Sequence, residues 1–96
     1  MIQSRRKQIY SIDAKLYLSE EQHYPSLLNE LEDILAEEAA SYEAMPEGPK
    51  QSDRGAESKE AQVCLQRAIK ALGKVVDGKR KTQELMDEVH DDLRLV

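Results

Sequence analysis

The clearest candidates for catalytic chemistry are two pairs of carboxylates in the second half of the chain. Glu57 and Glu60 stand three residues apart, and Glu84 and Asp87 repeat that spacing after 23 intervening residues. Carboxylates three residues apart lie on one face of a helix, and their hard oxygen atoms suit Mg²⁺. Two such pairs on neighbouring helices would hold magnesium for phosphate chemistry, provided that the chain folds back between them.

The spacing of these carboxylates resembles that of the all-α nucleoside triphosphate pyrophosphohydrolases, whose Glu-x-x-Glu and Glu-x-x-Asp pairs hold magnesium between adjacent helices. The resemblance implies a magnesium-dependent pyrophosphohydrolase as an alternative function. A single helix through this region would separate the two pairs by about 40 Å, at 1.5 Å per residue. Only a hairpin between Gly73 and Gly78 would bring the pairs together, so the continuity of that helix decides between the two interpretations.

The two histidines and the single cysteine offer little further chemistry. Glu20 with His23, and Asp87 with His90, are similar in spacing to the carboxylate-x-x-His ligands of di-iron bundles. In a chain folded back at its centre the two pairs do not meet, so we expect structural or solvent-facing roles for both histidines. Cys64 has no histidine near it in that register and is interpreted as a small buried or half-buried residue rather than a nucleophile. We therefore predict no catalytic residue, no metal site and no cofactor.

A stretch rich in proline and glycine, residues 45–55, is the strongest turn signal in the chain and a better candidate for a binding site. The helix that follows it begins with free amide groups and the positive end of the helix dipole, which attract phosphate or carboxylate. A plain capped turn is the alternative. Four polar residues around this helix start are predicted to bind an anionic small ligand or a partner: Lys50, Ser52, Arg54 and Lys59.

Charge is strongly segregated along the chain. The net charge is −5, but residues 25–48 alone carry −7, because seven acidic residues occur there without a lysine or arginine. Such a surface repels nucleic-acid backbones, so we expect no direct binding of DNA or RNA. Two short basic clusters, 5–7 and 79–81, are interpreted as solvated helix faces, with contact to an acidic partner as the alternative. The acidic segment could imitate nucleic acid toward a basic host protein, and its predicted binding residues are Glu30, Asp33 and Glu37.

The residues around these candidate sites favour helices throughout. Ala, Leu, Glu, Lys and Gln dominate outside the turn, and no alternating strand pattern persists, so the predicted fold class is all-α. Positions spaced four and three apart from Ala61 to Leu93 are apolar except for Lys79 and Thr82. This pattern predicts one long helix over 56–93, with a kink or short loop at 73–78 as the alternative.

The first half of the chain contains two apolar registers that do not join across Pro25. Proline removes a backbone donor and disfavours helical geometry at the preceding residue. We therefore expect a helix over 4–19, a helix over 26–44, and a kink or short break near 19–26. Folding back at the turn would make the whole chain one domain, an antiparallel helical hairpin with a kinked first half.

A second apolar stripe lies beside the main one on both long helices. It consists of Leu27 and Ile34 in the first half, and of Ile69 and Val76 in the second. One antiparallel partner buries only one narrow stripe on each helix. We therefore predict that these four residues form an interface between copies, most simply in a two-fold dimer that completes a helical bundle. The alternative is that the helix over 4–19 folds back and covers the second stripe within one chain.

The segment from Tyr42 to Leu72 contains Tyr-Glu-Ala-Met-Pro-Glu, then Gln-Ser-Asp-Arg-Gly, then a helix with regularly spaced leucine and alanine. It resembles a group of short helical proteins encoded by phages and prophages, which share an acidic helix, a Pro-Glu turn, Ser-x-Arg-Gly and a heptad helix. The resemblance implies a small accessory protein of a mobile element. In that group non-enzymatic inhibitors of host defence, including nuclease inhibitors and nucleotide sponges, are frequent.

Together these patterns predict a non-enzymatic binding protein that occupies a host protein through its acidic helix or sequesters an anionic ligand at the turn. The pyrophosphohydrolase and a purely structural helical oligomer are the alternatives. No apolar run approaches the roughly 18 to 20 residues of a membrane span. We therefore expect a cytoplasmic protein with no membrane partner, in the host cytoplasm if it is phage-encoded.

Overall fold

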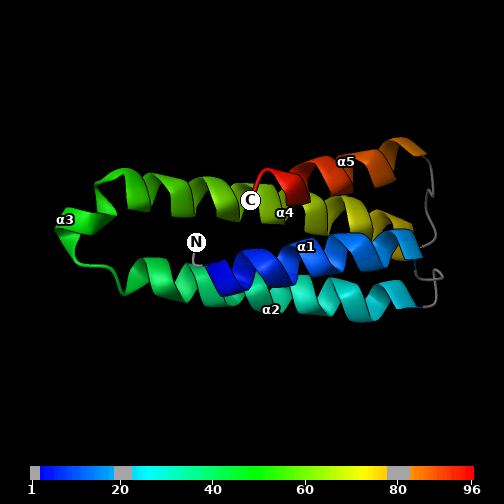
Figure 1. The fold of residues 1–96 in the computed structure, drawn as a ribbon, viewed down its shortest axis with the longest axis horizontal. Helices are drawn as coiled ribbons and strands as arrows, with labels where there is room; N and C mark the ends of the chain where they lie inside the picture. Colours follow the sequence, from blue (N-terminus) through cyan, green and yellow to red (C-terminus); the bar gives the residue numbers. More distant parts are fainter. Residues whose placement is uncertain (1–2, 19–22, 78–82) are drawn as a thin grey trace.

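The computed structural model describes residues 3–18, 23–77 and 83–96, and every regular element in these ranges is a helix (Figure 1). This confirms the predicted all-α class. The helices are α1 (Gln3–Leu18), α2 (Tyr24–Glu43), α3 (Glu47–Lys50), α4 (Asp53–Val76) and α5 (Gln83–Arg94).

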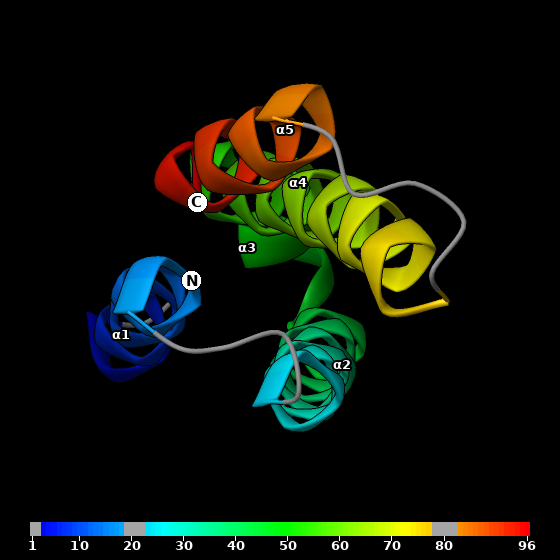
Figure 2. The same cartoon turned by 90° about the vertical axis from the view of Figure 1, so that its right-hand side faces the viewer.

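The helices form an elongated bundle around the two longest, α2 and α4, which run in opposite directions (Figure 1). The short helix α3 lies at the end where α2 leads into α4. Figure 2, which looks along the bundle, shows α1 beside α2 and α5 against α4. The molecule measures 43 × 20 × 18 Å along its principal axes.

The first two helices begin and end close to their predicted bounds. The helix expected over 4–19 is α1, and the helix expected over 26–44 is α2. Pro25 lies in the first turn of α2, where the missing N–H costs no helical hydrogen bond. The expected kink or break near 19–26 falls largely on residues 19–22, which lie outside the described residues.

The prediction of one helix over 56–93 is wrong. Helix α4 ends at Val76, and α5 packs against the C-terminal half of α4 (Figure 1). The N–H of Asp77 donates the last helical hydrogen bond, to the carbonyl oxygen of Gly73 at 2.9 Å. Glycine lowers helix propensity by about 1 kcal/mol, and the apolar residues on both sides of this point gain cover when the chain turns back.

One apolar core runs through the four long helices. Each helix contributes aliphatic residues spaced three or four apart, which is the spacing of a single helix face. The small alanines of α4 allow neighbouring helices to approach it closely. The core residues below 3% exposure are Ile9, Leu16, Leu31, Leu65, Ala68, Ala71, Leu72, Val89 and Leu93.

The second apolar stripe is largely covered within the chain. Leu27 and Ile34 are buried in the core, at 4% and 5% exposure, while Ile69 and Val76 are half-buried and pack against it. Helix α1 lies along α2 and contributes to the cover of the α2 residues. The reason for expecting a second copy is therefore removed at Leu27 and Ile34, and self-association stays a prediction.

The predicted turn is partly helical. Helix α3 occupies its middle, and α4 begins at Asp53, three residues before the predicted start. Gly55 is buried against the backbone of Lys50, and a Cβ atom at residue 55 would overlap the carbonyl oxygen of Lys50. Glycine at this position therefore allows α3 to pack closely against α4.

Candidate functional site

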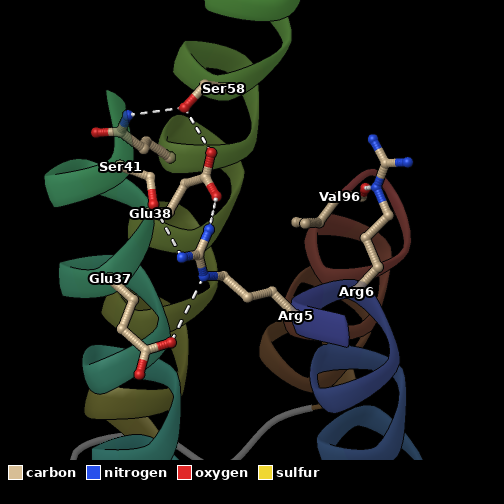
Figure 3. Close-up of polar contacts among 8 residues, drawn as sticks. Arg5, Arg6, Glu37, Glu38, Ser41, Ser58 and Val96 are labelled. Atoms are coloured by element: carbon tan, nitrogen blue, oxygen red, sulfur yellow. Dashed lines mark hydrogen bonds and ion pairs between the residues drawn. The ribbon is translucent and has the colours of Figure 1, made fainter. Parts of the chain in front are cut away.

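A buried polar junction joins α1 to α2 (Figure 3). The guanidinium of Arg5 donates from Nη1 to Glu38 Oε1 at 3.0 Å and from Nη2 to Ser41 Oγ at 2.9 Å. The Nε atom of Arg5 also lies 3.5 Å from Glu37 Oε2. A basic residue of the first helix thus contacts the acidic helix of the same chain, and contact of cluster 5–7 with an acidic partner stays a prediction.

The same junction extends to α4. Ser58 Oγ donates to Glu38 Oε2 at 2.5 Å, and Gln62 Nε2 donates to Ser58 Oγ at 3.4 Å. The side chain of Glu38 is 1% exposed and Ser58 is fully buried. Both oxygens of Glu38 therefore have partners, and the junction fixes three helices relative to one another rather than offering a reactive group.

A second buried polar contact joins α1 to α5. Asp13 accepts a hydrogen bond from His90 Nδ1, and Arg94 Nε lies 3.7 Å from Asp13 Oδ2. His90 has the structural role expected for it, while His23 is exposed just before α2. Near the start of α1, Arg6 Nε donates to the carbonyl oxygen of Val96 at 3.1 Å (Figure 3).

An open groove of about 560 Å³ lies between α1 and α2, and we call it the α1/α2 groove. Two buried isoleucines, Ile12 and Ile34, form its apolar base. The α2 wall consists of Glu30, Asp33 and Glu37, and the α1 wall of Lys7, Gln8, Ser11 and Lys15. All three acidic residues predicted as a binding surface are therefore brought together here.

The opposite charges on the two walls stay apart. Among the described residues, Lys7, Lys15, Glu30 and Asp33 make no ion pair or hydrogen bond, and Glu37 reaches only Arg5. These groups are exposed, apart from the half-buried Arg5. The groove therefore presents unpaired charge of both signs on rigid helices.

The four residues predicted at the turn are only partly brought together. Lys50 Nζ lies 5.0 Å and Lys59 Nζ 5.5 Å from the centre of the Tyr42 ring, within the range of cation–π contacts. Lys50 Nζ also lies 3.5 Å from Glu43 Oε2. Tyr42 was not predicted as a site residue, although it stands at the end of the acidic segment.

The other two turn residues, Ser52 and Arg54, are exposed at the start of α4. Ser52 has extended backbone geometry, as the residue before a helix normally does, and its carbonyl oxygen accepts from Ala56 N–H at 3.1 Å. Only the two lysines gather on the Tyr42 ring, so Arg54 stands apart from them among the described residues.

The single cysteine lies beside a buried acid. Burial raises the pKa of the Asp92 carboxyl, and the charge of Arg67 opposes that rise. Burial also raises the pKa of the Cys64 thiol, and the nearby charge of Asp92 adds to the effect. A thiol with a raised pKa stays protonated at neutral pH and is a weak nucleophile, as the sequence interpretation of Cys64 expected.

The carboxylate pairs that suggested magnesium chemistry are not assembled. Helices α4 and α5 do fold back on each other, but α5 lies along the C-terminal half of α4 (Figure 1). Glu57 and Glu60 stand in the first turns of α4 and so lie beyond the reach of Glu84 and Asp87. Within the described parts of the chain, no group of three or more His, Cys, Asp or Glu could hold a metal ion.

The α1 wall of the groove was missed by sequence reasoning. Lys7, Ser11 and Lys15 follow one another at intervals of four, next to the apolar face of the same helix. This spacing marks a polar row on one side of a helix. The row becomes part of a site only once α1 is known to lie along α2.

None of the helices among the described residues is both long and apolar enough to cross a membrane. Comparison with protein-family models, curated proteins and solved structures gave no match to this chain. The function is therefore argued from the groove and the turn themselves.

Proposed function

We propose that this chain is a non-enzymatic binding protein that occupies a basic surface of a host protein through the α1/α2 groove. The observation that carries the proposal is the gathering of Glu30, Asp33 and Glu37 along one wall of an open groove. Glu30 and Asp33 make no ion pair among the described residues, so their charge is available to a partner.

The backbone that supports these carboxylates is held firmly. Leu31 and Ile34 stand between them in the sequence and are buried in the core. Glu38, one turn beyond Asp33, is fixed by Arg5 and Ser58. A partner therefore meets a preformed row of negative charge, which lowers the ordering cost of binding.

The strength of such binding is limited by solvent. Exposed ion pairs contribute about 0–1 kcal/mol each, so three of them give modest affinity that falls as salt is added. Their larger effect is to steer a basic partner and raise its association rate. Resemblance to phage and prophage accessory proteins supports a host protein as the partner and the host cytoplasm as the place of action.

A second candidate function is the sequestration of an anionic small ligand at the turn. The observation that favours it is the convergence of Lys50 and Lys59 on the Tyr42 ring, close to the start of α4. Two ammonium groups beside an aromatic surface suit a ligand that carries phosphate or carboxylate.

The two candidates are separated by a pair of charge variants. The first, Glu30→Gln/Asp33→Asn/Glu37→Gln, is expected to abolish binding of an amidated lysine-rich helical peptide, measured by calorimetry at low salt. A matched control, Glu32→Gln/Glu57→Gln/Glu60→Gln, removes three exposed carboxylates elsewhere and is expected to retain most of that binding. Equal losses in both variants would contradict a role for the groove.

The second variant, Lys50→Gln/Lys59→Gln, tests the turn. Native mass spectrometry of the protein recovered from a host lysate reports any retained small anion and the number of subunits. The sequestration candidate expects a bound anion that this variant loses, while peptide binding at the groove is unchanged. If neither variant alters any binding, both candidates fail.

A further inference from the structure

The α1 wall of the groove carries charge that a purely basic partner would not use. Lys7 and Lys15 flank Ser11, and both lysines are exposed and make no ion pair among the described residues. A ligand with only positive groups would be attracted by Glu30 and Asp33 and repelled by these lysines. The chemical complement of the whole groove therefore carries charges of both signs.

The spacing along each wall indicates the shape of that complement. Lys7 and Lys15 are eight residues apart, about 12 Å along the helix, and Glu30 and Glu37 are seven apart, about 10.5 Å. A helix lying along the groove repeats its own side chains every seven residues, at about 10.5 Å. Side chains on one face of an extended strand repeat at about 6.6 Å, or about 13.2 Å over two repeats, so the helix repeat is the better match to the acidic wall.

We propose that the α1/α2 groove binds an α-helix of the partner that carries a row of basic residues beside a row of acidic residues. The basic row lies against Glu30, Asp33 and Glu37, and the acidic row against Lys7 and Lys15, with Ser11 between them. This inference rests on the proposed function and adds the chemistry of the partner segment.

The apolar base of the groove adds little to this recognition. Ile12 and Ile34 are only 3% and 5% exposed before any partner binds, so almost no further apolar area remains to be covered. Binding therefore depends on the match between charged rows, and added salt weakens it.

Three alanine-based helical peptides of about 18 residues, long enough to form helix when capped, test the match. The two-row peptide carries lysines along one face and glutamates along the neighbouring face. The scrambled peptide has the same composition with both rows broken. The one-row peptide has every glutamate replaced by glutamine. Calorimetric titration of the full chain measures each dissociation constant.

The two-row peptide is expected to bind about three- to ten-fold more tightly than the scrambled peptide, the gain from two or three exposed pairs. In Lys7→Gln/Lys15→Gln this preference becomes smaller, because only the contacts between the basic row and the acidic wall remain. The same variant binds the two-row peptide more weakly than the wild type does. Its binding of the one-row peptide is not weakened, because the lysines of that peptide are no longer repelled by Lys7 and Lys15. The control Lys70→Gln/Lys74→Gln removes two exposed lysines from α4 and leaves the preference intact.

Two results would overturn the inference. In the first, the wild type binds the scrambled and two-row peptides equally, while binding of the one-row peptide is still lost in Glu30→Gln/Asp33→Asn/Glu37→Gln. The proposed arrangement of two charged rows is then wrong, and the proposed function stands. If none of the three peptides binds at low salt, the proposed function at the groove fails as well.

Discussion

Helices α1 and α5 both pack on the central pair α2 and α4, but they are attached in different ways. Helix α5 lies along α4, its successive turns burying Leu85, Met86, Val89 and Leu93. Helix α1 also buries aliphatic residues, but its attachment to α2 adds the polar contact of Arg5 with Glu38, and Asp13 joins α1 to His90 of α5. Packed apolar side chains hold helices by shape, and directional polar contacts add a further constraint on their register.

The polar contacts of α1 determine which of its residues face the α1/α2 groove. The contacts of Arg5 with Glu38 and of Asp13 with His90 hold the apolar face of α1 inward. Lys7 and Lys15, on the neighbouring row of that helix, are then left on the groove.

The largest effect is expected from the apolar attachment of α5. Leu93→Ala removes a fully buried side chain and should lower the free energy of unfolding by about 3–4 kcal/mol, through lost transfer energy and the cavity left behind. Urea unfolding followed by circular dichroism measures the loss. Leu95→Ala, at an exposed position two residues later, serves as the control and should change stability by less than about 0.5 kcal/mol.

The next largest effect on stability is expected at the polar contact that attaches α1 to α2. Arg5→Leu leaves the carboxylate of Glu38 buried without its guanidinium and should cost about 2–3 kcal/mol, below the usual cost of a broken buried pair because Arg5 is 15% exposed. The double variant Arg5→Leu/Glu38→Leu removes both charges and should recover most of that loss. If the double variant is no more stable than Arg5→Leu, the contact contributes no more than ordinary packing.

The smallest effect has the opposite sign and concerns the buried acid of α5. Burial raises the pKa of Asp92 above its usual 3.8, so the unfolded state loses its proton first as the pH rises. Ionised Asp92 therefore destabilises the fold, and this penalty grows between the unfolded and folded pKa values and is complete above both. Asp92→Asn should raise the melting temperature slightly at pH 7 and leave it unchanged near pH 3. Asp91→Asn, at the exposed neighbour, should show no such pH-dependent gain.

The sequence predicts the helices well because their signals are local. Pro25 marks the start of α2, and the Pro/Gly-rich stretch marks the passage into α4. The turn after Val76 is different. One register of four and three runs from Ala61 to Leu93, with Lys79 and Thr82 as its two polar members. Because α4 and α5 bury their faces against the same core, this register suits two helices folded together as well as one straight helix, and periodicity alone does not distinguish them.

The candidate site likewise contains residues that the sequence could predict and residues that it could not. Glu30, Asp33 and Glu37 could be predicted because a run of acidic residues without lysine or arginine is visible in the sequence itself. Lys7 and Lys15 could not, since an apolar stripe shows that a helix is buried but not which helix covers it. The opposite wall of the groove depends on a tertiary contact between α1 and α2.

The four long helices touch in a closed order, α1 on α2, α2 on α4, α4 on α5, and α5 on α1. Three of these contacts join helices that follow closely along the chain. The fourth brings Asp13 to His90 across 77 positions of sequence and carries the largest loop-closure entropy. During folding, the contact between α1 and α5 should therefore form last, after the three contacts between helices that follow closely along the chain.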